Sequence, residues 1–380
     1  MTLFQDADGD PRAAPEKLAD VLSWYGAVGD AVAGNPVGFC RRKASIATAL
    51  CDAAVDSIEE SRATYFAGLL HAIGSVGNEA YCKNGDLAPR FARSERWDVS
   101  PQGARIAASI DALPAQTPDL IRWQGECWDG TGYPDNLRWH AIPQRAQFLA
   151  LADLYARTED PEETLGAIGL QSGRAFSPPA ARIFTMWFHA NAGAAALRPI
   201  PWESLADTTR ADELFDDIAD RIDAHNGVAG RWRRIQRIAA STGRALQCDG
   251  VILRDLEIAS RVYGAGELAS TSVESSQFDA LARLGIDDRA RHALYAGELC
   301  AQVPSLHNAG ATVAMRGEWY DGTGKPHGVT HGAIPIAARI LSAAIACDAL
   351  DRAQRLETAA GTQFDPHVVR ALLAAEGARA

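Results

Sequence analysis

The chain has 380 residues, of which 47% are hydrophobic and 22% charged, as in a folded globular protein with room for two domains. A formal net charge of −11 gives no attraction for phosphate backbones, so we expect no nucleic-acid partner. No apolar run approaches the roughly 18 residues that cross a bilayer, and seven cysteines without a CxxC pair argue against a disulfide framework or a zinc ribbon. We therefore expect a cytoplasmic protein without a membrane span.

The first clear helical pattern lies at residues 46–58. Ile46, Leu50, Ala54 and Ile58 recur at helical spacing, with acidic residues on the opposite face, which predicts one amphipathic helix. Alternating β-branched runs are nearly absent, so the pattern favours an all-α fold over a sheet.

An apolar stretch follows at residues 66–73 and contains His71. A histidine in such a stretch is more often a hydrogen-bonded core residue than a ligand, and both roles stay open for His71.

Two copies of one motif mark sharp loops. Residues 126–134 read Glu-Cys-Trp-Asp-Gly-Thr-Gly-Tyr-Pro, and residues 318–326 read Glu-Trp-Tyr-Asp-Gly-Thr-Gly-Lys-Pro. The paired glycines supply positive φ angles and the proline prevents immediate continuation as a helix, so each motif is a loop between helices. We expect the aspartates of these loops to accept hydrogen bonds from backbone N–H groups just ahead of them.

The motif belongs to a tandem duplication with an offset of 192 residues. The same offset carries Ile142-Pro143 onto Ile334-Pro335, and Gly38 with Arg41-Arg42 onto Gly230 with Arg233-Arg234. Each copy also ends in a helix-start signal, Ser177-Pro178 in the first and Asp365-Pro366 in the second. We predict a first domain at 1–195, a linker at 196–211 and a second domain at 212–380.

The first motif, with Ile142-Pro143 and Ala152-Asp153 after it, closely resembles the HD-GYP family, a subgroup of the HD superfamily of metal-dependent phosphohydrolases. Many members of this family hydrolyse cyclic di-GMP. The resemblance covers about residues 20–190 and, more faintly, about 212–378, where Lys325 replaces the expected tyrosine. It implies two all-helical HD-type bundle domains in tandem.

The resemblance also implies two or three iron or manganese ions held by histidine and aspartate, but most of these ligands are missing. His71 is present, Ala72 replaces the bridging aspartate, and Gln124 and Gly125 replace paired histidines. Only His71 and Asp153 remain as candidate ligands, too few for a two-metal centre. In the second copy the matching residues are Tyr263, Gly264, Arg316, Gly317 and Ile345, while His292 matches residues 99–100.

Other residues offer three further roles. Glu126, His140 and His189 are candidates for a rebuilt metal or catalytic site, together with His71 and Asp153. Arg41 and Arg42 are interpreted first as residues of a solvated helix face; the alternative is that one of them replaces the lost metal charge beside Asp153 or holds a phosphate. The residues that we single out for binding a ligand or partner are Asp129, Gly130, Thr131, Gly132, Tyr133, Asp321, Gly322, Thr323, Gly324, Lys325, Arg41 and Arg42.

The main hypothesis is a degenerate HD-GYP protein, a non-catalytic or weakly catalytic binding or regulatory module in bacterial cyclic di-GMP-type signalling, without a metal cofactor. The first alternative is a metal-dependent phosphodiesterase with a reduced or rebuilt iron or manganese site. The second is a scaffold that binds signalling proteins through the two Gly-rich loops. The expected ligand is cyclic di-GMP or another phosphorylated small molecule.

Overall fold

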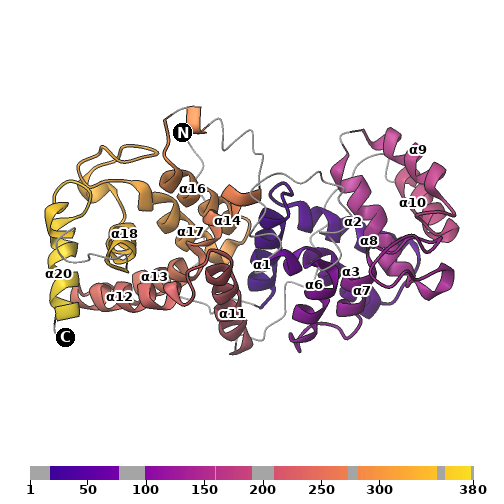
Figure 1. Cartoon of the computed structure of the whole chain (residues 1–380), viewed down its shortest axis with the longest axis horizontal. Coiled ribbons are helices and arrows are strands. Elements are labelled where there is room, and N and C mark those ends of the chain that lie inside the picture. Colours follow the sequence, from indigo (N-terminus) through magenta and orange to yellow (C-terminus); the bar gives the residue numbers. More distant parts are fainter. Residues whose placement is uncertain are drawn as a thin grey trace.

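The structure, a computed structural model, describes residues 18–76, 99–158, 160–190, 209–272, 281–283, 285–348 and 356–377. These residues form helices and loops, with two isolated β-bridges and no strand within the described ranges (Figure 1). The predicted all-α fold class is confirmed.

Each half of the chain is a bundle of helices. The first half contains α1 (Leu18–Val32), α2 (Phe39–Ala53), α3 (Ile58–Leu69), η1 (Ile73–Ser75), α6 (Val99–Ala108), α7 (Thr117–Trp123), η2 (Trp139–Ala141), α8 (Gln144–Arg157), α9 (Pro161–Gln171) and α10 (Pro178–Ala190). The second contains α11 (Thr209–His225), α12 (Arg231–Ala245), α13 (Gly250–Val262), α14 (Ala265–Ser272), α16 (Asp288–Ala301), η4 (Pro304–Leu306), α17 (His307–Ala314), η5 (Met315–Gly317), η6 (His331–Ala333), α18 (Ile336–Asp348) and α20 (Pro366–Gly377).

The two halves repeat each other in backbone detail. Gly38 precedes α2 with φ 81° and Gly230 precedes α12 with φ 69°, a left-handed conformation that favours glycine. Gly130 and Gly322 lie in the two loops with φ 80° and 84°. The predicted helix starts are also confirmed, since Ser177 caps α10 by accepting the N–H of Ala180 and Asp365 caps α20 by accepting that of His367.

The expectation of a single helix across residues 46–58 is wrong. α2 ends at Ala53, and Val55 turns the chain with φ 60°. Ser57 then starts α3 with a capping box, in which its side chain and that of Glu60 bond each other's backbone N–H. This strong start signal interrupts the apolar spacing and leaves Ile58 75% exposed.

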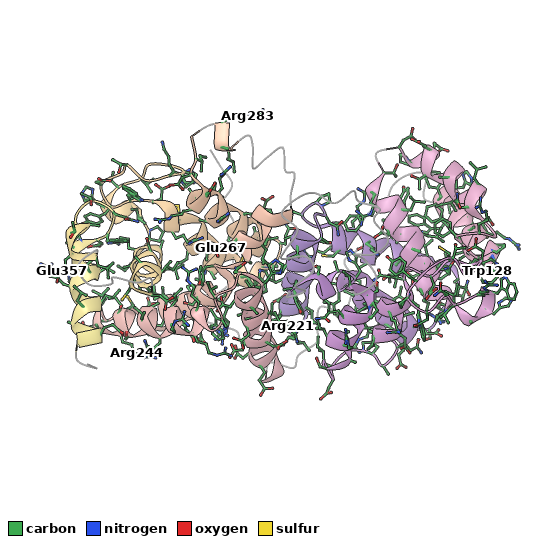
Figure 2. All side chains as sticks on the ribbon, viewed as in Figure 1. Trp128, Arg221, Arg244, Glu267, Arg283 and Glu357 are labelled. Carbon is green, nitrogen blue, oxygen red and sulfur yellow. The ribbon has the colours of Figure 1, made fainter. Side chains whose placement is uncertain are left out.

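α1 joins the halves because it is buried along nearly its whole length. It packs on α2, α3 and η1 of its own half and on α11, α14 and α16 of the other. Trp24 of α1 meets Phe215 of α11 edge to face, with ring centroids 5.1 Å apart and neither residue exposed. Figure 1 shows α1 and α11 at the junction, and Figure 2 places Trp128 and Glu357 at opposite ends of the molecule.

The predicted linker falls mostly outside the described residues, which omit 191–208. α11 already begins at Thr209, inside the predicted linker range of 196–211. Among the described residues no helix has the length and apolar character needed to cross a membrane.

Candidate functional site

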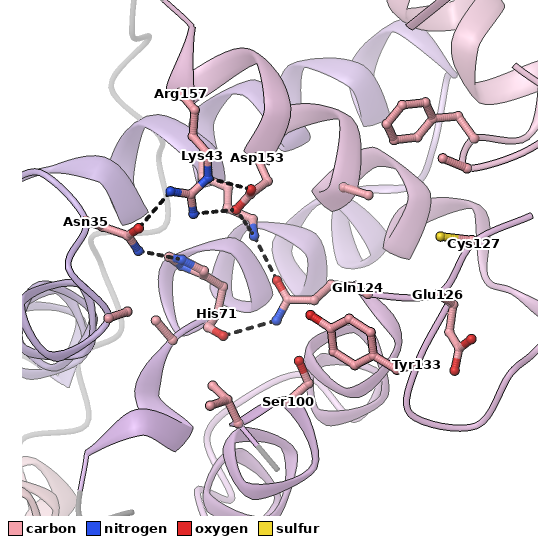
Figure 3. Close-up of a pocket in the computed structure, with 17 residues that line it drawn as sticks. Asn35, Lys43, His71, Ser100, Gln124, Glu126, Cys127, Tyr133, Asp153 and Arg157 are labelled. Atoms are coloured by element: carbon pink, nitrogen blue, oxygen red, sulfur yellow. Dashed lines mark hydrogen bonds and ion pairs between the residues drawn. The ribbon is translucent and has the colours of Figure 1, made fainter. Parts of the chain in front are cut away.

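A cavity of about 550 Å³ opens in the first half at the place where the surviving family residues meet. It lies between the helices α2, α6 and α8 and the end of α7, beside the first Gly-rich loop (Figure 3). Its polar lining residues are Asn35, Lys43, His71, Ser100, Gln124, Glu126, Cys127, Tyr133, Asp153 and Arg157.

Asp153 of α8 is held by two cations. Lys43 of α2 donates from Nζ to Oδ1 at 2.9 Å, and Arg157, one turn further along α8, donates from Nε to Oδ2 at 2.8 Å and from Nη2 to Oδ1 at 3.3 Å. Burial favours the neutral acid, but the charges of Lys43 and Arg157 outweigh it and hold the pKa of Asp153 well below its usual range. Asp153 is therefore an ionised carboxylate with both oxygens paired.

Gln124 fixes the other side of the Lys43 ammonium. Its Nε2 donates to the backbone carbonyls of His71 and Ile121, each at 3.1 Å, which turns its Oε1 towards Lys43 Nζ at 2.8 Å. The Lys43 side chain is only 3% exposed. Its ammonium is thus bound between an amide oxygen and a carboxylate oxygen.

His71 is a buried neutral imidazole. Its Nδ1 lies 3.1 Å from the carbonyl oxygen of Gly68 and so carries the proton, which leaves Nε2 to accept from Asn35 Nδ2 at 3.4 Å. Burial, followed by the charge of Lys43, lowers the pKa of His71 well below its usual value. Asn35 also donates to Asp30 Oδ1 at 2.9 Å, so His71 belongs to a buried hydrogen-bond network.

The residues present do not fit the two-metal centre that the fold family implies. Asp153 has both oxygens on cations, and a bound ammonium repels a metal ion beside it. A side chain at Gly125 would require the ring of Tyr133 to move, because a Cβ there would lie 2.6 Å from it. Among the described residues no group of three or more His, Cys, Asp or Glu side chains is placed to hold a metal.

Of the residues predicted for a rebuilt site, His71, Glu126 and Asp153 line the cavity, whereas His140 and His189 do not. Glu126 accepts the backbone N–H groups of Asp135 and Leu137 at 2.6 and 3.0 Å, and therefore braces its own loop. His140 stacks edge-on against Trp128 at 5.2 Å, and His189 is exposed at the end of α10. None of these contacts brings Glu126, His140 or His189 to Asp153.

The two Gly-rich loops have the same internal construction. Asp129 accepts the backbone N–H of Thr131 at 3.0 Å, and Asp321 accepts that of Thr323 at 2.9 Å, which confirms the predicted bracing. Glu318 repeats the role of Glu126 by accepting the N–H groups of residues 327 and 329. In the first loop Tyr133 lines the cavity (Figure 3), whereas docking of a partner on either loop stays a prediction.

The cations at Asp153 are neither Arg41 nor Arg42. Arg41 donates to the backbone carbonyl of Gln302 in the second half, and Arg42 is exposed. Lys43 and Arg157 supply the charge instead. Both left a signal in the sequence. Lys43 precedes the buried residues Ile46, Ala47 and Leu50 of α2 by three, four and seven positions, which places it on the same helix face. Arg157 follows Asp153 by four residues, the spacing of an ion pair on one helix face.

In the second half, the positions that correspond to His71 and Gln124 are occupied by a buried tyrosine and an arginine. Tyr263, at the position of His71, is 1% exposed, and the guanidinium of Arg316, at the position of Gln124, lies 5.7 Å from the centre of its ring. The predicted match of His292 to residues 99–100 is supported by backbone packing. A Cβ on Gly74 would meet the carbonyl of Val99, and one on Gly266 would meet that of His292.

Two curated relatives come from Vibrio cholerae serotype O1 (strain ATCC 39315 / El Tor Inaba N16961). A cyclic di-GMP phosphodiesterase is 32% identical over 103 residues, which cover 24% of this chain and 20% of the relative. A probable cyclic di-GMP phosphodiesterase is 33% identical over 101 residues, covering 24% of this chain and 23% of the relative. The matched part is thus less than a quarter of either relative's length.

The crystal structure of a cyclic GMP-AMP-specific phosphodiesterase of Vibrio cholerae aligns over 96% of this chain and 98% of that chain, with a TM-score of 0.65 and 17% sequence identity. At this identity the likeness shows a shared fold. The model of the HD domain family matches residues 27–170 and 216–365, one stretch in each half. The chain therefore belongs to the HD domain family and carries two such domains.

Proposed function

We propose that the first-half cavity binds a phosphorylated nucleotide without hydrolysing it. The observation that carries this proposal is the pairing of both Asp153 oxygens with Lys43 and Arg157. A metal-activated water needs a bound ion with an open coordination position. Asp153 does not bind such an ion while an ammonium and a guanidinium occupy both of its oxygens. The side chains therefore favour a receptor over a hydrolase.

Arg157 is the group that meets the ligand. Its guanidinium has five N–H groups, of which three donate to Asp153 and Asn35. The guanidinium lies 4.4 Å from the ring centre of Phe39, which holds its plane, and its side chain is 39% exposed. The remaining N–H groups suit a phosphate oxygen. Tyr133 and Phe176 line the same cavity and offer aromatic faces to a base.

The second candidate function is a phosphodiesterase acting on cyclic di-GMP. The names of the two Vibrio cholerae relatives favour it over a receptor, and so does the name of the protein with the shared fold. Against it stands the missing donor set, since Glu126 and His140 would have to leave their present contacts and His189 does not line the cavity. A scaffold for signalling proteins remains a further prediction for the Gly-rich loops.

Calorimetric titration tests the receptor. We expect cyclic di-GMP or cyclic GMP-AMP to bind the full chain at one site, and Arg157→Met to weaken binding at least about tenfold, the loss of one charged hydrogen bond. The matched control is Arg182→Met, since Arg182 is exposed on α10 and does not line the cavity. Equal affinities in the two variants, or no binding of either nucleotide, would refute the proposal.

Hydrolysis separates the two candidates. The same nucleotides are incubated with the protein and iron(II) or manganese(II), and the products are separated by chromatography. Unchanged nucleotide supports the receptor. Steady conversion that disappears in His71→Ala establishes the phosphodiesterase instead.

A further inference from the structure

At one place the two halves differ in both partners of an ion pair. Lys43 and Asp153 form the ion pair of the first half, and the residues at the same positions of the second half, 192 residues on, are Ile235 and Ile345. The ammonium and its carboxylate are thus both replaced by isoleucine. Exchange of both partners avoids the cost of leaving one charge buried without the other, which is the expected behaviour of residues that act as a unit.

The second half supplies a different cation at the corresponding place. Arg316 occupies the position of Gln124, which binds the Lys43 ammonium in the first half. Its guanidinium lies 5.7 Å from the ring centre of Tyr263, the residue at the position of His71, and that of Arg231 lies 5.6 Å from the same ring centre. Glu267 provides the main opposing charge to Arg316. A cation therefore stands beside the His71 position in the first half and beside the Tyr263 position in the second, supplied by different elements.

These places coincide with the positions where the HD family resemblance implies metal ligands. In the first half the two contacts of the ammonium are Asp153 at 2.9 Å and Gln124 at 2.8 Å. A side-chain cation bound there offers positive charge but no electron-pair acceptor orbital, so it can stabilise a carboxylate without activating water. It also disfavours a divalent ion by charge repulsion.

We propose that both halves are metal-independent HD domains in which a built-in cation, Lys43 in the first and Arg316 in the second, replaces the metal centre. The native fold of each half then needs no divalent ion. This holds whether or not the cavity binds a nucleotide, so it stands apart from the proposed receptor function.

Metal dependence is tested on the full chain. Protein expressed with added iron and manganese and purified without chelator is analysed for metal content, and its thermal unfolding is followed with EDTA, with manganese(II) and with neither. We expect a metal content far below one ion per chain and the same midpoint in all three conditions. One or more ions per chain, or a midpoint lowered by EDTA, would overturn the proposal.

Variants test the exchange itself. Lys43→Ile leaves Asp153 with Arg157 alone, and Asp153→Ile leaves both cations without their carboxylate. The two together reproduce the residues of the second half at these positions and leave only Arg157, which is 39% exposed, without its partner. We expect each single variant to unfold several degrees below the wild type and the double variant to recover most of the loss. A double variant that unfolds as low as the sum of the singles predicts would contradict a paired exchange.

The second half has its own variant. Arg316→Gln removes the cation and restores the residue found at position 124, and we expect it to lower the unfolding midpoint. The control is Arg370→Gln, an exposed arginine on α20. Equal midpoints in these two variants would exclude Arg316 as a built-in cation.

Discussion

Asp30 and Asp223 are equivalent carboxylates that each fasten the start of the next helix. Asp30 of α1 accepts the backbone N–H of Cys40, the second residue of α2, at 2.6 Å. Asp223 of α11 accepts that of Trp232, the second residue of α12, at 2.8 Å. Both carboxylates are about 2% exposed or less. Each satisfies a helix N–H that has no partner within the helix.

Asp30 makes stability depend on pH. Burial raises its pKa from 3.8 to about 6, so the folded state keeps a proton that the unfolded chain has already lost between these values. The stabilisation is present below pH 4 and is lost as the pH rises through about 6. The free energy of unfolding lost over this range is at most about 3 kcal/mol. We expect urea unfolding of the wild type to lose more stability from pH 4 to 6 than that of Asp30→Asn.

The control for this pH dependence is Asp255→Asn, since burial also raises the pKa of Asp255 to about 6 in the other half. Each substitution is expected to remove only its own share of the slope. If the wild type and Asp30→Asn keep parallel profiles, Asp30 ionises normally in the folded protein.

The fold was predictable because its signals are local. Gly38, the Gly-rich loops and the caps Ser177 and Asp365 mark helix ends, and their recurrence along the chain reveals two copies. The cation at Asp153 was harder to predict, because Arg41, Arg42 and Lys43 are adjacent in sequence. Consecutive helical residues point about 100° apart. The apolar spacing places position 43 on the buried face of α2, and the packing of α2 on α8 brings that face to Asp153.

Glu126 and Glu318 are expected to stabilise their loops equally. Each accepts two backbone N–H groups, at 2.6 and 3.0 Å for Glu126 and at 2.6 and 3.2 Å for Glu318. Replacing either by Gln turns one acceptor oxygen into a donor that faces an N–H, at a cost of about 1.5–3 kcal/mol. Urea unfolding of Glu126→Gln and Glu318→Gln measures both. A catalytic Glu126 would instead lose activity without losing stability.

The Trp24–Phe215 contact is expected to couple the unfolding of the two halves. Both rings are fully buried where α1 packs against the second half. Phe215→Ala should cost about 3–5 kcal/mol and weaken the first half as well as the second. Hydrogen exchange compares α2 with α12 in the wild type and in this variant. Faster exchange in α12 alone would show that the halves unfold independently.

The last prediction concerns a second exchange between the halves. In the first half the side-chain amide of Gln147 accepts the backbone N–H of Ser177 at 2.9 Å. At the equivalent positions of the second half Arg339 donates from its guanidinium to the carboxylate of Asp365, which is 5% exposed. A neutral hydrogen bond therefore joins α8 to the start of α10 in the first half, and an ion pair joins the equivalent elements, α18 and the start of α20, in the second.

Asp365→Ser alone leaves Arg339 without its carboxylate, at a cost of about 3–5 kcal/mol for a buried pair. Adding Arg339→Gln restores the neutral combination of the first half and removes the unpaired charge. The double variant should therefore be more stable than Asp365→Ser, as measured by urea unfolding of all four proteins in a double-mutant cycle. Additive losses would mean that the two residues contribute separately and that the halves diverged here one residue at a time.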